Sequence, residues 1–491
     1  MHVIQTEFIK TIAEQLQYIS YTMSADFFER YYQAYQKEQS VAAKCALLQV
    51  LKNAELAKST RRPLCQDTGI VIAFLEIGLN VKWVGDMTPE EMINAAVKIA
   101  YNDYPANLLR ASVVKNPGGN RKNTKNNTPA ITHVKITHGD KLIVKLIAKG
   151  GGSEFKTTFT VLNPSDSIVD WVVAKMPELG AGWCPPGIIA LGIGGTAEKA
   201  MLLSKEALFN PLNIGELLRD GAMNDIEQLR IDIYEKINSL KIGAQGFGGD
   251  TTVLDVLIKD YPTHAATLPV ALTVSCSATR HAHFEYSTHK APICLSNFIP
   301  NLSDAPQSES NNFTHINTNL YSRKDLTKLK AGDRVKLSGK IYTARDAAHQ
   351  RLQNLFENGE KLPDNLNFNN AFIYYVGPVA AVKDEIIGPA GPTTAKRMDK
   401  FSRFMLENLN ISGMIGKGER NRDTNILIKK HGAIYFAATG GAACLISQCV
   451  KSVRVAAFED LGMEAIFEFE VEDMPLIVAV DTNGESIYNF N

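Results

Sequence analysis

Hydrophobic residues recur at helical spacing over the first sixty positions of the chain. The apolar positions of residues 8–19 repeat every three or four residues and predict one helix. Residues 24–58 continue with the pattern of one or two further amphipathic helices. The chain is therefore expected to begin with a helical layer.

Strand-like patterns enter after this layer. Residues 69–79, GIVIAFLEIGL, are almost entirely apolar and predict a buried strand. Thr88 and Glu91 have the spacing of a capping box, which marks the start of a helix. Residues 133–152, HVKITHGDKLIVKLIAKGGG, predict a β-hairpin with its turn at residues 138–140, followed by a glycine loop.

Helix-like and strand-like segments alternate from about residue 165 onward. The predicted helices are 165–178, 196–209, 222–240, 344–358 and 394–409. The predicted strands are 252–261, 267–276, 333–342 and 371–382. This alternation predicts a mixed α/β (α+β) fold.

One segment interrupts the alternation. Residues 299–324 are rich in Asn and Ser and poor in aliphatic side chains, which is typical of a linker. We therefore predict a large N-terminal domain at 1–300, a linker at 301–324 and a smaller C-terminal domain at 325–491.

Composition narrows the class of protein. The 491 residues balance 52 Lys and Arg against 52 Asp and Glu, and 45% are hydrophobic. This excludes a basic nucleic-acid arm, an acidic tail and a disordered polymer as the main feature. The first twenty residues carry Glu7, Lys10 and Glu14 and have no apolar signal core. We expect a cytoplasmic protein that binds neither a membrane nor nucleic acid.

Three glycine-rich loops lack the order of nucleotide-binding motifs. Their sequences are LGIGGTAEKA, GAQGFGGDTT and AKGGGSE, and none contains GxGxxG or a P-loop. They are either tight turns or places where backbone amides approach a small anion. ATP and NAD chemistry are disfavoured.

Cysteines offer the first candidate chemistry. Seven cysteines in a chain of this length do not form a secreted disulfide scaffold. Three stand in polar, turn-like settings: Cys65 in PLCQDTG, Cys184 in GWCPPG and Cys276 in SCSATRH. The other four, which we interpret as structural, are Cys45, Cys294, Cys444 and Cys449.

Three dispersed thiolates are too few to close a structural zinc site or to ligate a cluster fully. They suit a site that leaves one metal position open to act as a Lewis acid on substrate. A nucleophilic Cys65 paired with a histidine is the alternative from the residues alone.

Cations of the C-terminal half stand beside predicted helix starts. Arg345 lies in TARDAAHQR at a strand-to-helix turn, and Lys417 lies between glycines in MIGKGER. Thr393 is placed at a helix N-terminus with Arg397 four residues later. Taken singly, Thr393 is interpreted as a helix cap and each cation as a solvated surface charge. Taken together, these residues indicate a binding site for an anionic small molecule.

The order of several motifs resembles that of class I fumarate hydratases, the oxygen-sensitive iron–sulfur type, in their single-chain form. The motifs are PLCQDTG, LRASVV, KGGGSE, CPPG, THAATLPVAL, CSATRHAHFE, RDAAH, GPTTAKRMD and MIGKG. The resemblance covers nearly the whole chain. It implies a cluster-binding N-terminal domain, a smaller swivelling β/β/α domain, an active site between them, and a homodimer.

The resemblance also implies the chemistry of the site. It implies reversible hydration of fumarate to L-malate at a [4Fe–4S] cluster held by Cys65, Cys184 and Cys276, whose fourth iron is open to substrate. Its implied substrate contacts are Gln66, Asp67, Arg110, Gly152, His264, Arg345, Arg397 and Lys417. Thr393 with Asp67 resembles the family's proton-transfer pair.

Alternatives remain at the level of substrate and of class. The LRASVV motif is closer to the two-subunit branch, which includes tartrate dehydratases, so L-tartrate or mesaconate is a competing substrate. A cysteine hydrolase built on Cys65 and a non-catalytic iron–sulfur sensor are the rivals from other classes.

Overall fold

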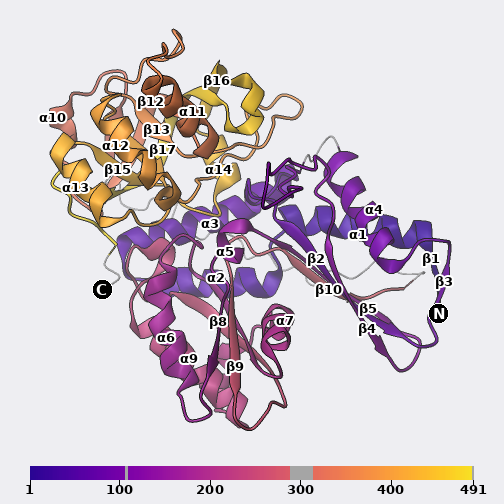
Figure 1. The fold of residues 1–491 in the computed structure, drawn as a ribbon. Helices are drawn as coiled ribbons and strands as arrows, with labels where there is room; N and C mark the ends of the chain where they lie inside the picture. The colour runs from indigo at the N-terminus through magenta and orange to yellow at the C-terminus, as the bar shows by residue number, and fades with distance from the viewer. Residues whose placement is uncertain (105–108, 288–312, 489–491) are drawn as a thin grey trace.

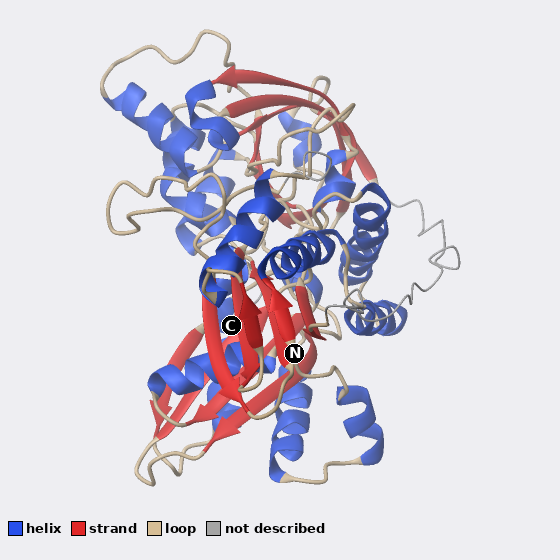
Figure 2. Ribbon diagram, turned by 90° about the vertical axis from the view of Figure 1, so that its right-hand side faces the viewer, coloured by secondary structure: helices blue, strands red, loops and turns tan. Residues whose placement is uncertain are grey.

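The structure of the chain is a computed structural model that describes residues 1–104, 109–287 and 313–488. Figure 1 shows the C-terminal part, in orange and yellow, resting on a layer of N-terminal helices, with two sheets extending from the other side of that layer. The mixed α/β prediction is confirmed (Figure 2). Within the described ranges, no helix is long and apolar enough to cross a membrane.

The helical layer has the three members that the pattern indicates. They are α1 (Gln5–Tyr21), α2 (Ala25–Lys37) and α3 (Val41–Thr60). Helix α3 is apolar on most of its circumference because it contacts α1 and α2 as well as α14 (Ala443–Ser447) of the C-terminal part. It therefore forms the floor on which the C-terminal part sits.

The first sheet corrects the predicted hairpin. Its order is β10 (His281–Glu285), β5 (Leu142–Lys149), β2 (Ile70–Gly78), β4 (Ile131–Thr137). The two strands of the expected hairpin form, but β2 lies between them, parallel to β4 and antiparallel to β5. The reason is burial: β2 is buried at nearly every position and takes the centre, whereas the largely exposed β4 takes the edge.

Helices cover the first sheet on one side. Helix α1 packs with α4 (Pro89–Asn102) over its apolar face. The capping box predicted at the start of α4 is confirmed, with Thr88 and Glu91 exchanging their hydrogen bonds. A parallel pair of short strands, β1 (His2–Ile4) and β3 (Lys82–Val84), closes this end of the molecule.

The second sheet has the order β6 (Thr158–Leu162), β9 (Leu268–Ser275), β7 (Gly187–Gly194), β8 (Val253–Tyr261). Helices α6 (Ile168–Leu179) and α9 (Asp225–Ser239) lie on one face and α7 (Ala197–Ala207) on the other (Figure 1). Helix α7 approaches so closely that a Cβ on Gly192 would lie 1.9 Å from the carbonyl oxygen of Ala200. Short helices α5 (Gly151–Glu154) and α8 (Ile214–Asp220) complete this half.

The C-terminal strands form one sheet whose pairings close on themselves. The ring is β12 (Arg334–Thr343), β13 (Phe372–Tyr374), β14 (Gly413–Gly416), β15 (Ile434–Ala437) and β17 (Ile466–Val480), closed by antiparallel pairing of β12 with β17. β11 (Thr314–Asn317) and β16 (Val450–Ala457) flank it. The helices of this part are α10 (Arg323–Leu326), α11 (Asp346–Glu357), α12 (Asp399–Glu407), α13 (Arg422–His431) and α14.

Two predicted segments end differently from the expectation. The predicted strand 371–382 is only three residues long in β13, because Gly377 and Pro378 follow it. Of the predicted linker, residues 301–312 lie outside the described residues, and β11 within 313–324 pairs in parallel with β12. We propose that the C-terminal domain begins near residue 313.

Candidate active site

Three loops bring Cys65, Cys184 and Cys276 together from distant parts of the chain. Cys65 lies between α3 and β2, Cys184 between α6 and β7, and Cys276 directly after β9. The Ser277 N–H donates to the Cys184 carbonyl oxygen at 3.1 Å, which joins two of the loops directly. The pKa of the Cys184 thiol is raised to about 11, mainly by burial and also by charge repulsion from Cys276 and Cys65, although Lys417 lowers it.

The three thiols fit a cluster better than a single ion. Among the residues that the structure describes, no three His, Cys, Asp or Glu side chains lie close enough together to hold one metal ion. Cysteines that ligate a multi-iron cluster each bind a different iron, so they need not meet at one point. Two buried thiols, Cys65 and Cys184, and the half-buried Cys276 stand near a cation, and this is a donor set that such a cluster would stabilise.

A cavity of about 640 Å³ opens beside the cysteines between the two halves of the chain. It collects every predicted substrate or catalytic residue except His264, namely Gln66, Asp67, Arg110, Gly152, Arg345, Thr393, Arg397 and Lys417. The first four come from the N-terminal half and the others from the C-terminal half. The site therefore exists only when the two halves are in contact.

Lys417 links the cavity to the cysteines. Its Nζ donates to the Cys184 Sγ at 2.8 Å, and its backbone is bridged to Thr394. Burial alone would lower the pKa of Lys417, but the charges of Cys184 and Cys65 raise it above its ordinary value. The lysine is thus a fixed positive charge at the point where cavity and cysteines meet.

Asp67 is an ionised carboxylate although it is enclosed. Its Oδ2 accepts the Gly151 N–H at 2.8 Å. Burial would raise its pKa, but Arg110, Arg280 and Lys417 hold it below the ordinary value. A negative charge on the cavity wall is therefore maintained by the cations around it.

Two arginines carry donors without acceptors. The Nε atoms of Arg110 and Arg345 are buried and have no hydrogen-bond partner within residues 1–104, 109–287 and 313–488. Arg110 donates from Nη1 to the Gly377 carbonyl oxygen at 2.6 Å, and burial lowers its pKa to about 10, with Arg345 adding repulsion. Arg345 pairs with Glu464 at 3.3 Å. Buried donors left over in a cationic cavity are positioned for an anion.

Arg397 and Thr393 come from the segment before α12. Arg397 is half-exposed and pairs with Asp346 at 3.2 Å. The helix cap predicted at Thr393 falls one residue later, at Thr394, because the 3₁₀ turn begins at Ala395. Thr393 is instead held by its backbone, donating to the Tyr375 carbonyl oxygen at 2.7 Å. Its hydroxyl is therefore left to the cavity.

Gln66 connects the first cysteine to the C-terminal half. Its Nε2 donates to the Pro392 carbonyl oxygen at 3.2 Å, and its Oε1 accepts from the Cys65 thiol at 3.2 Å. A Cβ on Gly391 would lie 2.3 Å from the Gln66 Oε1, so a larger residue at position 391 would displace the Gln66 amide. Gly152 lies on the opposite wall, in α5.

His264 is the predicted contact that the structure places elsewhere. It is exposed in the turn between β8 and β9, where its Nδ1 accepts the Ala266 N–H at 3.1 Å. β9 separates this turn from Cys276, and its eight residues span about 26 Å at roughly 3.3 Å per residue. His264 therefore cannot reach the cavity of its own chain.

Sequence reasoning missed several charged residues of the site. Arg280 is buried and donates from Nη1 to the Asp67 carbonyl oxygen. Glu419 accepts the Ala181 N–H at 2.9 Å across the two halves, and Lys156 lines the cavity. Arg280 and Glu419 stand inside CSATRH and MIGKGER, so their proximity to a predicted ligand and a predicted cation was the available signal.

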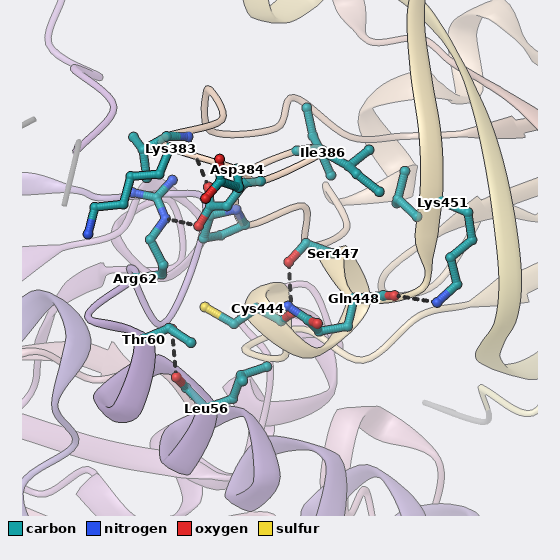
Figure 3. Close-up of a pocket in the computed structure, with 15 residues that line it drawn as sticks. Leu56, Thr60, Arg62, Lys383, Asp384, Ile386, Cys444, Ser447, Gln448 and Lys451 are labelled. Carbon is teal, nitrogen blue, oxygen red and sulfur yellow. Dashed lines mark hydrogen bonds and ion pairs between the residues drawn. The ribbon is translucent and has the colours of Figure 1, made fainter. Parts of the chain in front are cut away.

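A second cavity lies on the other side of α14. It measures about 490 Å³ and is lined by the end of α3, residues 382–389 and α14 (Figure 3). Arg62 and Glu385 form an ion pair there at 2.8 Å. None of the predicted site residues lines it, and acids and cations are mixed on its walls.

Comparison with known proteins shows the family to which the chain is related. A family model described as fumarate hydratase (Fumerase) matches residues 9–285, and one described as fumarase C-terminus matches residues 295–490. The chain is 33% identical over 472 residues to "Fumarate hydratase class I, anaerobic" of Escherichia coli (strain K12), which covers 92% of this chain and 84% of that protein. It is 33% identical over 457 residues to "Fumarate hydratase 2" of Leishmania major, covering 90% and 79%.

A third relative matches only the N-terminal half. It is named "Putative L(+)-tartrate dehydratase subunit alpha" and comes from Methanocaldococcus jannaschii. The identity is 39% over 259 residues, which cover 51% of this chain and 87% of that protein.

Proposed function

This chain belongs to the fumarate hydratase family, and from that premise we propose that it catalyses the reversible hydration of fumarate to L-malate. The observation that carries the proposal is a cationic cavity beside two buried thiols and one half-buried thiol. Two of its arginines have buried Nε donors that find no acceptor among the described residues. A dicarboxylate supplies two anionic groups to such a cavity, and its reacting carbons would lie between them.

Cys65, Cys184 and Cys276 would hold a [4Fe–4S] cluster. When bound, the cluster supplies a Lewis-acidic iron without a protein ligand, which lowers the cost of hydroxide departure by an amount on the order of several kcal/mol. Lys417, hydrogen-bonded to Cys184, offsets part of the negative charge that three thiolates bring into a buried site.

The arginines would bind the substrate carboxylates. Arg110 and Arg345 each keep a buried N–H without an acceptor, and carboxylate oxygens are the strongest neutral-pH acceptors for guanidinium donors. Arg397 is more exposed and can follow a carboxylate as the site closes. Since the cations come from both halves, substrate binding draws the halves together and excludes water.

Thr393 and Asp67 would move the proton at the carbon next to the departing hydroxyl. A threonine hydroxyl is a weak base, so the proton it takes needs a nearby anion to stabilise the transfer. Asp67 lines the same cavity and is kept ionised by the surrounding cations.

Substrate preference is the point at which a second candidate has support. The relative that matches the N-terminal half is named a putative L(+)-tartrate dehydratase subunit. Anaerobic purification and iron reconstitution, followed by kcat/KM for L-malate, L-tartrate and mesaconate, tests the proposal. We expect L-malate to be preferred; a wide margin in favour of tartrate would refute fumarate as the substrate while keeping the hydro-lyase mechanism.

Removing Arg397 should weaken turnover without removing the cluster. The Arg397→Ala variant loses one charged contact to a carboxylate, about 1.5–3 kcal/mol, which corresponds to roughly a tenfold to hundredfold lower kcat/KM for malate. Iron content per chain should stay at the wild-type level. Lys400→Ala is the matched control, because Lys400 is an exposed cation of the same segment that lies over the Phe401 ring.

We also propose a cytoplasmic homodimer in which His264 acts on the neighbouring chain. The chain's own β9 holds His264 too far from the cavity, so as a substrate contact it must come from a second copy. Mixing inactive His264→Ala and Thr393→Val protomers should restore measurable malate turnover in the mixed dimers. Two inactive variants that stay inactive when mixed would contradict a contact between chains.

A further inference from the structure

One short segment of the C-terminal half touches the loops of all three cysteines. It is residues 440–445, the end of the turn after β15 together with the first three residues of α14, and we call it the clasp. Figure 1 shows α14 at the base of the C-terminal part beside α3, and Figure 3 shows Cys444 of α14 above Leu56 and Thr60 of α3. The clasp thus lies at the contact between the two halves, behind the cysteines.

Gln245 joins the clasp to the loop of Cys184. Its side chain is buried, and its Nε2 donates to the carbonyl oxygens of Pro185 at 3.1 Å and Gly440 at 3.2 Å. The Gly440 N–H donates back to Gln245 Oε1 at 2.9 Å. Because Pro185 directly follows Cys184, one amide sets the distance between this cysteine loop and the clasp.

The loop of Cys276 meets the same glycine. Ser277, the next residue, donates from its hydroxyl to the Gly440 carbonyl oxygen at 3.1 Å. A Cβ on Gly440 would lie 2.2 Å from the Cys184 Sγ, and a Cβ on Gly441 would lie 2.4 Å from the Ser277 Oγ. Only glycines allow the clasp to approach these two loops so closely.

Asn53 of α3 joins the clasp to the loop of Cys65. It is fully buried, and its Oδ1 accepts the backbone N–H groups of Cys444 at 2.8 Å and Leu445 at 3.1 Å. Its Nδ2 donates to the carbonyl oxygen of Leu64, the residue before Cys65, at 3.0 Å. The third cysteine is therefore tied to the clasp by a second buried amide.

We propose that the clasp positions the three cysteines, with Gln245 as the positioning residue that couples Cys184 to Gly440. The inference rests on the proposed three-cysteine site and adds a role for residues that touch neither substrate nor iron. Its physical basis is that hydrogen bonds, either direct or through one buried side-chain amide, connect each cysteine loop to the same six-residue segment of the other half. Removing one of these connections should make the cysteine loops more mobile. The hydrophobic core of the C-terminal sheet should stay packed, because it does not depend on the clasp hydrogen bonds.

The test is alkylation of cysteines in cluster-free protein. Wild type, Gln245→Leu and Gly440→Ala are pulsed with iodoacetamide, and each cysteine is followed by peptide mass spectrometry. We expect Cys184 and Cys276 to be labelled about tenfold faster in Gln245→Leu, the change that losing one buried hydrogen bond produces. Labelling should also be faster in Gly440→Ala, because the added Cβ would overlap the Cys184 Sγ and force the clasp away from it. Labelling of Cys45, a buried thiol of α3 outside the three cysteine loops, should not change. Iron retained after reconstitution should fall by about half or more in parallel.

A matched control and two opposite outcomes decide the proposal. Gln17→Leu removes another buried glutamine amide, one that donates to the Ala100 carbonyl oxygen away from the clasp, and should leave Cys184 labelling unchanged. Unchanged labelling of Cys184 in Gly440→Ala, or equal acceleration of Cys45, would overturn the clasp. A wild-type protein that binds no iron would refute the cluster instead, while the labelling pattern would still decide the clasp.

Discussion

The Cys276→Ser variant is expected to lose cluster iron and malate turnover together. Serine is not a ligand that retains an iron–sulfur cluster as thiolate does. Without the open iron, departure of hydroxide loses its Lewis acid, so turnover should fall by about a thousandfold or more. Iron analysis and EPR of the reduced protein measure the loss of the cluster, and anaerobic malate assays measure the loss of turnover on the same sample.

Cys449→Ser is the matched control for that variant. The Cys449 Sγ has only long contacts, 3.9 Å each, to the carbonyl oxygens of Leu445 and Asp473. Burial raises the pKa of its thiol to about 11, and Cys449 lies outside the three loops that carry the predicted ligands. The variant should keep iron and activity at a stability cost of about 1 kcal/mol. Equal damage from the two serine variants would contradict the three-ligand assignment.

The Thr393→Val variant is expected to keep its iron and lose its turnover. Valine has the shape of threonine without the hydroxyl, and the backbone hydrogen bonds that hold residue 393 remain possible. Loss of a proton-transfer group should lower kcat by about 10²–10⁴-fold. KM for malate should change little, because the arginines still bind both carboxylates.

Thr394→Val distinguishes chemistry from local structure in this experiment. Thr394 is the neighbouring cavity residue, and its hydroxyl donates to the Gly182 carbonyl oxygen at 3.5 Å. Its loss should cost less than about tenfold in kcat, since it removes one weak hydrogen bond. Comparable losses at both positions would remove Thr393 from the proposed proton transfer and leave Asp67 to be tested as Asp67→Asn.

The zero net charge of the chain conceals a strongly polarised site. Arg110, Arg345, Arg397 and Lys417 line one cavity although their positions are spread over three hundred residues. Asp67, Glu464 and Asp346 offset part of the repulsion between these cations. The buried Nε donors of Arg110 and Arg345 remain available for an anion. Composition therefore excludes polyanion binding but says nothing about this local excess of positive charge.

Local pattern determined the secondary structure well wherever one stretch of sequence was sufficient. The three N-terminal helices, the capping box at Thr88 and the strand at 69–79 follow from spacing and cap chemistry, which involve only neighbouring residues. Most residues of the cavity could likewise be predicted from sequence motifs, because the charge or hydroxyl group that each supplies belongs to its own side chain. The resemblance to a known family then indicated that these residues act in one active site.

Tertiary structure decided which segments meet. The strands at 131–137 and 142–149 are not paired as a hairpin, because the more buried β2 takes the place between them. His264 has a motif sequence like the other contacts, yet β9 carries it away from the cavity. Gln245 and Gly440 have no distinctive sequence chemistry, and they matter only because folding brings them against the cysteine loops. Periodicity records the environment of each residue, whereas strand partners and site geometry depend on residues that are far away in the chain.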